Sequence, residues 1–328
     1  MTGAAGFIGH AVCLRLLADG YAVVGVDSLN DYYDVSLKQA RLRLIVDDPN
    51  FTFVQADVAE HSEIFEVFEQ GSPSHVIHLA AQAGVRYSLE NPNAYLQSNL
   101  IGFFNILECC RHFGIEHLVY ASSSSVYGRN VKTPFEEGDR VDCPVSLYAA
   151  TKRSNELLAY AYSCSHSLPA TGLRFFTVYG PLGRPDMAYF GFTDRYFAGK
   201  PITIFNNGDV IQDLYRDFTY IDDVVDGVVA VSTHIPGGEV PHALFNIGNE
   251  SPVRLMDFIA TLEKALSNSL GRPIEFDKVF EGLVAGDVPA TYASTDKLEQ
   301  AVGFRPTTPL AEGLRRFTDW YVAYNGVS

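Results

Sequence analysis

Hydrophobic and polar positions follow two rhythms along the first half of the chain. Short apolar runs, typical of strands buried on both faces, alternate with segments whose apolar residues recur every three or four positions, as in amphipathic helices. The runs predict strands at 21–27, 51–57, 75–81, 117–123 and 173–180. The periodic segments predict helices at 7–18, 35–46, 62–69, 94–113 and 147–166. This alternation predicts an α/β fold with a Rossmann-like, doubly wound parallel sheet.

The second half of the chain has a looser pattern. After residue 180, Gly and Pro become frequent and the apolar runs shorten. Helices are expected near Thr193, Ile221, Leu255 and Pro309. We therefore predict two domains, a Rossmann-like domain at 1–180 and a smaller C-terminal lobe at 181–328, with the chain crossing back to the large domain.

The start of the chain departs from the usual plan of a doubly wound sheet, in which a strand feeds the first glycine-rich turn. Here the turn TGAAGFIG begins at Thr2, which leaves no residues for that strand. We expect a longer form of the protein to supply the strand. The alternative is a fold that lacks the strand and compensates for it.

Composition excludes several classes of partner. The 328 residues are 47% hydrophobic and 19% charged, so the chain can bury a large core. Asp and Glu outnumber Lys and Arg by 39 to 24 without a local basic patch, which argues against nucleic acid. No apolar run approaches the roughly 20 residues that span a bilayer, so no membrane partner is expected. Five cysteines without metal-ligand spacing favour reduced thiols and a cytoplasmic location.

The glycine-rich turn is the first candidate for chemistry. Gly3, Gly6 and Gly9 permit positive φ angles, close approach to a pyrophosphate and tight packing of the next helix. That helix opens with Phe7 and Ile8, where free amide groups favour an anion.

An acidic residue follows the turn at the spacing expected of a dinucleotide site. Asp27 ends the next predicted strand, where a carboxylate binds ribose hydroxyls and repels a 2′-phosphate, which favours NAD over NADP. The alternative is that Asp27 only caps the following turn.

Other predicted strand ends extend the cofactor site. Asp57 closes a strand in the same layer, so we expect it to meet the adenine together with Val58. Small residues after the third strand leave room for a cofactor. The expected cofactor residues beyond the turn are Asn30, Asp57, Val58, Leu79, Ala80, Ala81 and Asn99.

Tyr148 and Lys152 lie one helical turn apart, so the phenol and the ammonium share one face. One interpretation is a half-buried tyrosine that packs beside a snorkelling lysine. The other is that the lysine charge lowers the tyrosine pKa and makes the phenol a proton shuttle.

Several separated motifs resemble one family over nearly the whole chain. TGAAGFIG, LAAQAGVRYS, ASSSSVYG, YAATK, FFTVYGP and RDFTYIDDVV together resemble extended short-chain dehydrogenases/reductases of the nucleotide-sugar epimerase branch. Within that branch, DSLNDYYDVSLKQARL and VYGPLGRPDMA are most similar to UDP-glucuronate 4-epimerases. The large domain is then the NAD-binding domain, and the C-terminal lobe binds the nucleotide sugar.

The resemblance implies a catalytic set. Tyr148 is the acid and base, Lys152 lowers its pKa and binds the nicotinamide ribose, and Ser123 hydrogen-bonds the reacting hydroxyl, with Ser125 beside it. For each serine of 122–125, capping of the backbone at the strand end is an equally open reading. The implied reaction is redox-neutral, because hydride leaves C4 of the sugar for NAD and returns to the opposite face.

The serine turn also bears on the sugar. Related dehydratases carry an Asp-Glu pair and related decarboxylases a Glu where this chain has Ser124 and Ser125, so elimination and decarboxylation are disfavoured. We expect Arg184 to hold a glucuronate carboxylate, helped by Thr177 and the serines, with Arg86 as a second candidate. Arg184 could equally be a solvated loop arginine.

The UDP moiety is expected to lie against the C-terminal lobe. The resemblance places Arg216 at the diphosphate and the stretch from Phe205 to Asn207 at the uracil. The segment before Arg216 is longer than usual for the family, and Val284 and Ala285 stand where polar or proline residues commonly occur. Nucleotide affinity or base preference is therefore expected to differ.

No metal site is expected. Asp217, Asp222 and Asp223 are interpreted as turn and helix-start carboxylates, because hydride chemistry needs no metal. The histidines at 75, 78, 112 and 117 share no metal-ligand spacing and are interpreted as structural.

The predicted helices at 94–113 and 147–166 carry apolar residues on more than one face. We expect a homodimer through a four-helix interface, with a monomer of thicker core as the alternative. The function predicted is NAD-dependent 4-epimerisation of UDP-glucuronate to UDP-galacturonate. The alternatives are UDP-glucose 4-epimerase and a non-catalytic protein that binds NAD and a nucleotide sugar.

Overall fold

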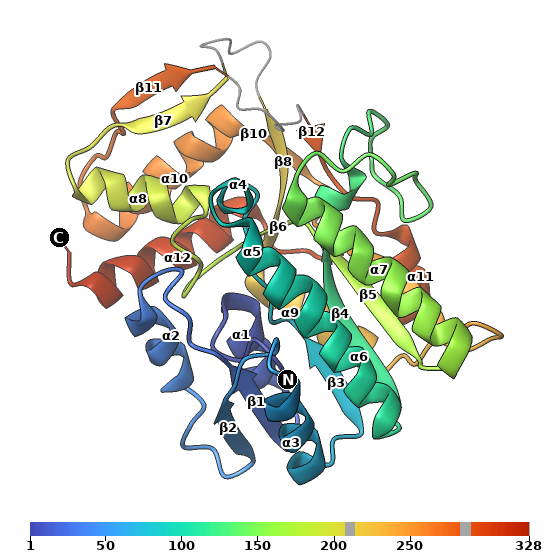
Figure 1. Cartoon of the computed structure of the whole chain (residues 1–328). Coiled ribbons are helices and arrows are strands. Elements are labelled where there is room, and N and C mark those ends of the chain that lie inside the picture. The colour runs from blue at the N-terminus through green and yellow to red at the C-terminus, as the bar shows by residue number, and fades with distance from the viewer. Residues whose placement is uncertain (207–213, 283–289, 328) are drawn as a thin grey trace.

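A parallel sheet with helices on both faces forms the larger part of the molecule, as predicted (Figure 1). The computed structural model describes residues 1–206, 214–282 and 290–327. The described strands of this sheet run parallel, in two groups with the orders β1-β2 and β3-β4-β5-β9. Their bounds are β1 Val23–Asp27, β2 Phe51–Gln55, β3 His75–His78, β4 His117–Ser123, β5 Ala170–Phe175 and β9 His242–Ile247.

The first two residues of the chain join these two groups. Thr2 forms parallel bridges to Val26 of β1 and to His78 of β3. Its N–H donates to the Ile77 carbonyl at 3.0 Å, and the Val26 N–H donates to the Met1 carbonyl at 2.8 Å. The place between β1 and β3, for which the sequence left no residues to form a strand, is therefore filled by Met1 and Thr2.

Helices cover both faces of the sheet. On one face, α1 (Phe7–Ala18) contacts α9 (Ile221–Ser232); on the other, α3 (His61–Gly71), α6 (Gly102–His112) and α7 (Leu147–His166) pack in a row. Neighbouring residues of β4 serve the two faces in turn, because Val119 belongs to one buried apolar cluster while Leu118 and Tyr120 belong to another. This two-sided burial explains the apolar runs in the sequence. The helix α2 (Val35–Leu42) is four residues shorter than the predicted 35–46.

The helix predicted at 94–113 is confirmed as one continuous helical run from Pro92 to His112, with a widened turn inside it. After the short helix α4 (Tyr87–Glu90), this run consists of α5 (Pro92–Tyr95), the π-helical turn η1 (Leu96–Ile101) and α6. Asn91 caps α5 by accepting the Ala94 N–H, and Pro92 occupies the first helical position, where it costs no hydrogen bond. In η1 the Asn99 carbonyl accepts Asn155 Nδ2–H of α7 at 2.6 Å, so a local widening of the helix serves a contact between helices.

The prediction of a single strand at 173–180 is wrong, because the chain passes from one sheet to another within this segment. The main-sheet strand β5 ends at Phe175, and Thr177 begins β6 (Thr177–Tyr179), which pairs with β8 (Tyr215–Tyr220) in a second sheet. Between them, the Phe176 N–H donates to the Ile247 carbonyl at 3.0 Å. Sequence periodicity cannot reveal this step, because both strands are apolar and buried.

The remaining elements build the second sheet and its surroundings. In the second sheet, β8 also pairs with β10 (Pro252–Arg254) and β12 (Ala290–Thr291). A separate two-stranded sheet is formed by β7 (Ile202–Phe205) and β11 (Lys278–Glu281). The other helices are α8 (Ala188–Phe197), α10 (Leu255–Leu270), α11 (Asp296–Val302) and α12 (Leu310–Asn325). The chain returns to the main sheet at β9, and the division into domains at residue 180 stays a prediction.

Candidate active site

A cavity of about 920 Å³ opens at the carboxyl ends of the main-sheet strands. Its lining runs from the glycine-rich turn at Gly3 past Ser123 and Tyr148 to Phe205 and Arg216 of the second lobe. Ligands of open α/β sheets bind at this edge. The volume suits two large ligands side by side better than one small metabolite.

The glycine-rich turn has the geometry of a phosphate-binding loop. Gly3 has φ +72°, and a Cβ on it would lie 2.8 Å from the Ala80 nitrogen; a Cβ on Gly9 would lie 1.9 Å from the Gly3 carbonyl oxygen. The turn leads into α1, whose N-cap Gly6 has no side chain to occupy the free amides and whose first turn has no acidic residue. Because Phe7 and Ile8 line the cavity, this helix end presents free amides and a positive dipole to an anion.

Asp27 caps the turn that follows it and also borders the cavity; its role at the ribose stays a prediction. Its Oδ2 accepts the Ala5 N–H at 3.0 Å and its Oδ1 accepts the Leu29 N–H at 2.9 Å, so it fastens the glycine turn to the loop after β1. It also lines the cavity. Asn30 lines it too, and its carbonyl and side-chain oxygens each accept Lys38 Nζ at 2.7 Å.

All but one of the expected cofactor residues line the cavity. Asp57, Val58, Leu79, Ala80 and Ala81 lie just beyond the strand ends. Asn99 is the exception: it is 1% exposed and its amide bonds the Gln82 backbone and the Thr151 hydroxyl. Asn99 therefore fixes the loop after β3 against α7 instead of facing a ligand.

Tyr148 and Lys152 both line the cavity, positioned by the start of α7. Ser146 caps this helix by accepting the Ala149 N–H at 3.1 Å, which places Tyr148 in the first turn and Lys152 in the next. The Lys152 ammonium is buried and donates to the Ala121 carbonyl of β4 at 2.9 Å. Burial lowers the pKa of Lys152 to about 8.

The pKa of Tyr148 reflects several groups of the cavity. Burial raises it, and the Ser123 hydroxyl and the Arg184 charge lower it. The Lys152 ammonium is held by the Ala121 carbonyl. That Lys152 also lowers the pKa of the phenol stays a prediction.

The serine turn shows the capping role as well. Ser123 Oγ accepts the Ser125 N–H at 3.1 Å and donates to Ser125 Oγ at 3.0 Å, which caps the 3-10 turn Ser124–Tyr127. Ser123, Ser124 and Ser125 all line the cavity. Capping and ligand contact are therefore compatible here.

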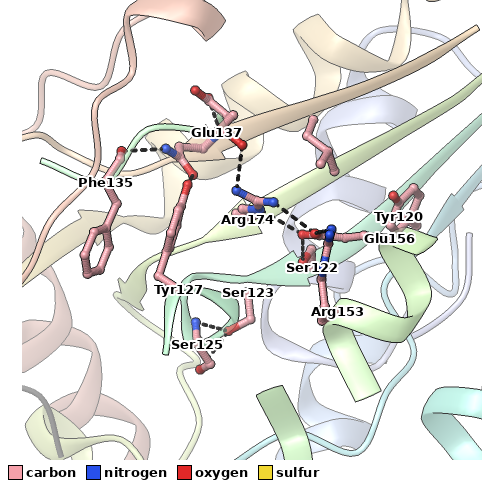
Figure 2. Close-up of polar contacts among 12 residues, drawn as sticks. Tyr120, Ser122, Ser123, Ser125, Tyr127, Phe135, Glu137, Arg153, Glu156 and Arg174 are labelled. Atoms are coloured by element: carbon pink, nitrogen blue, oxygen red, sulfur yellow. Dashed lines mark hydrogen bonds and ion pairs between the residues drawn. The ribbon is translucent and has the colours of Figure 1, made fainter. Parts of the chain in front are cut away.

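A buried ion pair behind this turn was not foreseen from the sequence. Glu156 of α7 accepts Arg174 Nε at 2.8 Å and Nη2 at 2.9 Å, and also the Ser122 hydroxyl at 2.6 Å and Arg153 Nη1 at 3.0 Å (Figure 2). Burial raises the Glu156 pKa, but these partners outweigh it and the net shift is downward. The pair fastens α7, which carries Tyr148, to β4 and β5. The available signal was Glu156 one turn after Lys152; its partner on β5 is invisible to spacing.

Arg184 lies on the loop after β6, partly exposed and paired with a carboxylate. Its Nε donates to Asp186 Oδ1 at 3.0 Å and its Nη2 to Asp186 Oδ2 at 2.5 Å, and Asp186 also accepts the Tyr32 hydroxyl at 3.3 Å. All three residues line the cavity with Thr177. Tyr32 and Asp186 lie inside the motifs that resemble UDP-glucuronate 4-epimerases, which was the signal that could have found them.

Phe205 and Arg216, which were expected to contact UDP, both line the cavity. The Arg86 guanidinium stacks over the Phe205 ring, 4.5 Å from its centroid, so Arg86 sits near the expected uracil site. Arg216 of β8 lines the cavity and donates to the Tyr215 carbonyl at 2.8 Å. The predictions for Asn207, the segment that follows it, Val284 and Ala285 fall outside the described residues.

Asp217 differs from its prediction. It lies inside β8, fully buried, and its carboxylate accepts the N–H groups of Asn249, Glu250 and Ala293. Burial raises its pKa to about 6. Asp222 and Asp223 do lie in the first turn of α9. Among the described side chains, no group of His, Cys, Asp and Glu is arranged to hold a metal, and no described helix is long and apolar enough to cross a bilayer.

Comparison with known proteins identifies the family. The model of the NAD dependent epimerase/dehydratase family matches residues 1–248. The chain belongs to this family. The resemblance inferred from the motifs is therefore confirmed, and the expected cofactor NAD fits the glycine turn and Asp27.

Several relatives of this epimerase align with almost its whole chain. Protein CapI of Staphylococcus aureus is 48% identical over 99% of this chain and 98% of its own length. A probable UDP-glucuronate 4-epimerase of Rhizobium meliloti (strain 1021) is 45% identical over 98% of this chain and 96% of its own. The crystal structure of UDP-glucuronic acid 4-epimerase from Bacillus cereus with UDP-glucuronic acid and NAD matches with a TM-score of 0.88, at 33% identity over 98% of both chains. The chain is an NAD-dependent nucleotide-sugar epimerase.

Proposed function

We propose that this epimerase interconverts UDP-glucuronate and UDP-galacturonate by inverting C4 through a 4-keto intermediate. The observation that carries the proposal is Arg184, whose guanidinium lines the same cavity as Tyr148 and acts on its phenol. Guanidinium matches the planar geometry of a carboxylate. The named relatives that act on UDP-glucuronate support the same substrate.

The residues of the cavity divide the work of the reaction. Tyr148 removes the proton from the sugar 4-hydroxyl and later returns it, while Ser123 hydrogen-bonds that hydroxyl. The glycine turn and Asp27 would hold NAD, which would supply reversible hydride exchange with C4 of the sugar. Burial raises the pKa of Tyr148, and the Ser123 hydroxyl and the Arg184 charge offset only part of this rise. The phenol therefore holds its proton in the protein alone, and the positive charge of oxidised NAD would favour the anion when the cofactor is bound. Lys152, held by Ala121, adds a buried cation next to the catalytic helix turn.

The serine turn protects the substrate carboxylate. A 4-keto uronate is a β-keto acid, which loses CO₂ when the carboxylate bond aligns with the carbonyl π system. Ser124 and Ser125 offer hydroxyl groups and no acid that would promote elimination. Arg184 and Thr177 line the same cavity and would hold the carboxylate out of alignment.

The direct test is incubation of the purified protein with UDP-glucuronate, with the sugar products followed by NMR. We expect UDP-galacturonate to accumulate to an equilibrium mixture. UDP-glucose in a parallel reaction tests the alternative hexose substrate. A pentose product, or turnover of UDP-glucose alone, would contradict the proposal.

Tyr148→Phe separates catalysis from binding. We expect turnover to fall about 10³-fold while NAD binding is retained, because the phenyl ring keeps the packing and loses only the proton. Tyr148 packs edge-on against Tyr95 at 6.1 Å, a contact that Phe preserves. If the wild-type protein binds NAD yet turns over neither sugar, the non-catalytic alternative holds instead.

We also propose a homodimer through η1, α6 and α7. Leu96, Ile101 and Phe104 are exposed on the first two elements, and Leu157 and Tyr160 are exposed on α7. Such a cluster on adjacent helices fits a four-helix interface. Sedimentation equilibrium should give the mass of two chains; the mass of one chain at micromolar concentration would contradict it. The cytoplasmic location stays a prediction.

A further inference from the structure

The arginine proposed to hold the substrate carboxylate already holds a carboxylate of its own chain. Asp186, two residues further along the chain, accepts hydrogen bonds from Nε and Nη2 of Arg184. The pair is part of the cavity wall, with side chains 24% and 30% exposed. Within the described chain, Nη1 of Arg184 donates to no acceptor, so the fork keeps an edge for a second carboxylate.

The loop that carries this pair is held from the cofactor side. Arg41, fully buried in α2, donates to the carbonyls of Leu182 and Gly183, directly before Arg184. Tyr32, in the loop before α2, donates its hydroxyl to Asp186. Because the backbone before Arg184 and the carboxylate beside it are both anchored, the guanidinium has a set direction.

Charge gives Asp186 a second effect. Arg184 and Asp186 together are neutral, so a neutral hexose meets no net charge at this wall. A hexuronate brings a carboxylate that is attracted by Arg184 and repelled by Asp186. The ring of the 4-keto sugar must also rotate inside the site, so that hydride can return to its opposite face. Its carboxylate must therefore leave the arginine once in every cycle.

We propose that Asp186 is a specificity-determining residue, which orients Arg184 for the substrate carboxylate and limits how tightly that carboxylate is held. This inference rests on the proposed function. It predicts an opposed pair of effects: without the Asp186 charge, the acidic sugar binds more tightly and is turned over more slowly. A residue with only a structural role would weaken binding and turnover together.

The test uses Asp186→Asn, which keeps an oxygen for Arg184 and Tyr32 and removes the charge. Binding is measured by calorimetry with NAD present, in the Tyr148→Phe background so that no sugar is consumed. We expect the Kd for UDP-glucuronate to fall about tenfold and that for UDP-glucose to change by less than about twofold. In the Tyr148 enzyme, KM and kcat for UDP-glucuronate should both fall.

Matched variants keep the inference falsifiable. Asp19→Asn removes a carboxylate that pairs with Arg15 Nε in α1, outside the cavity, and should change neither affinity. Asp186→Glu restores the charge and should return the affinity for UDP-glucuronate toward the wild-type value. An equal change for both sugars, or weaker binding of UDP-glucuronate in Asp186→Asn, overturns the proposal.

The outcomes distinguish this inference from the proposed function. If the wild-type protein does not epimerise UDP-glucuronate, the proposed function fails. If it does, and Asp186→Asn leaves the ratio of the two affinities unchanged while NAD binding shows an intact fold, only the role of Asp186 fails.

Discussion

Two arginine–carboxylate pairs border the active site, one behind the serine turn and one in the cavity wall. In both, Nε and Nη2 of the arginine grip the two oxygens of the carboxylate. Arg174 and Glu156 are each 1% exposed, whereas Arg184 and Asp186 are 24% and 30% exposed. The same pairing thus joins elements of the framework where it is buried, and borders the ligand cavity where it is partly exposed.

The elements that carry the two pairs explain this difference. Arg174 and Ser122 are paired residues of β5 and β4, and Glu156 projects from α7, so regular structure fixes every member of the buried pair. The exposed pair lies on a loop. Breaking a buried pair strands a charge and costs much, while an exposed pair is worth little to stability.

The largest expected effect is on the buried pair. Glu156→Ala leaves Arg174 without its carboxylate, so we expect the free energy of unfolding to fall by about 3–5 kcal/mol. Urea denaturation followed by circular dichroism measures this change. In the double variant Glu156→Leu/Arg174→Met, both charges are gone and most of the loss should be recovered. A double variant as unstable as Glu156→Ala would show that the ion pair itself is not the cause.

The exposed pair should respond in the opposite manner. We expect Arg184→Ala to lower kcat/KM for UDP-glucuronate about 100-fold, equivalent to about 2.7 kcal/mol, because a charged hydrogen-bond donor to the substrate is lost. Stability should change by less than about 1 kcal/mol. Steady-state kinetics and urea denaturation on the same preparation measure both. A stability loss as large as that of Glu156→Ala would erase the distinction between the pairs.

Lys152 extends the comparison of the two arginines, because it is a buried cation whose partner is a backbone carbonyl and not a carboxylate. Its pKa of about 8 in the folded protein lies below the ordinary lysine value, so the unfolded chain binds more protons between these values. Stability of the wild type relative to Lys152→Met should therefore rise with pH above about 8, by about 1–2 kcal/mol up to pH 10. Urea denaturation at pH 7, 8.5 and 10 measures it. A difference between the two proteins that does not vary with pH would contradict this assignment.

Much of the fold could be predicted because strand and helix rhythms are local properties of the chain. Helix 147–166 begins and ends as predicted, since Ser146 caps it and the apolar periodicity is continuous. The details that periodicity missed involve tertiary contacts: the π-helical turn inside helix 94–113 receives a hydrogen bond from Asn155, and the strand predicted at 173–180 changes sheet at Phe176.

The residues of the site show the same difference between local and tertiary features. Gly3, Asp27, Ser123 and Tyr148 were found because their motifs are contiguous in sequence, and the structure brings them to one cavity. Partners that meet only through folding, such as Arg174 for Glu156, leave no trace in spacing. The hydrogen bond from Lys152 to the Ala121 carbonyl is equally hidden, because it joins a helix to a strand far away in the sequence.

The passage of the chain from one sheet to the other at Phe176 has a mechanical consequence. Phe175 belongs to the strand paired with Ser123, and Thr177 to the strand paired with Phe218, so a single residue connects the two sheets there. Ser123 and Phe218 both border the cavity, so this short connection sets the position of one cavity wall relative to the other.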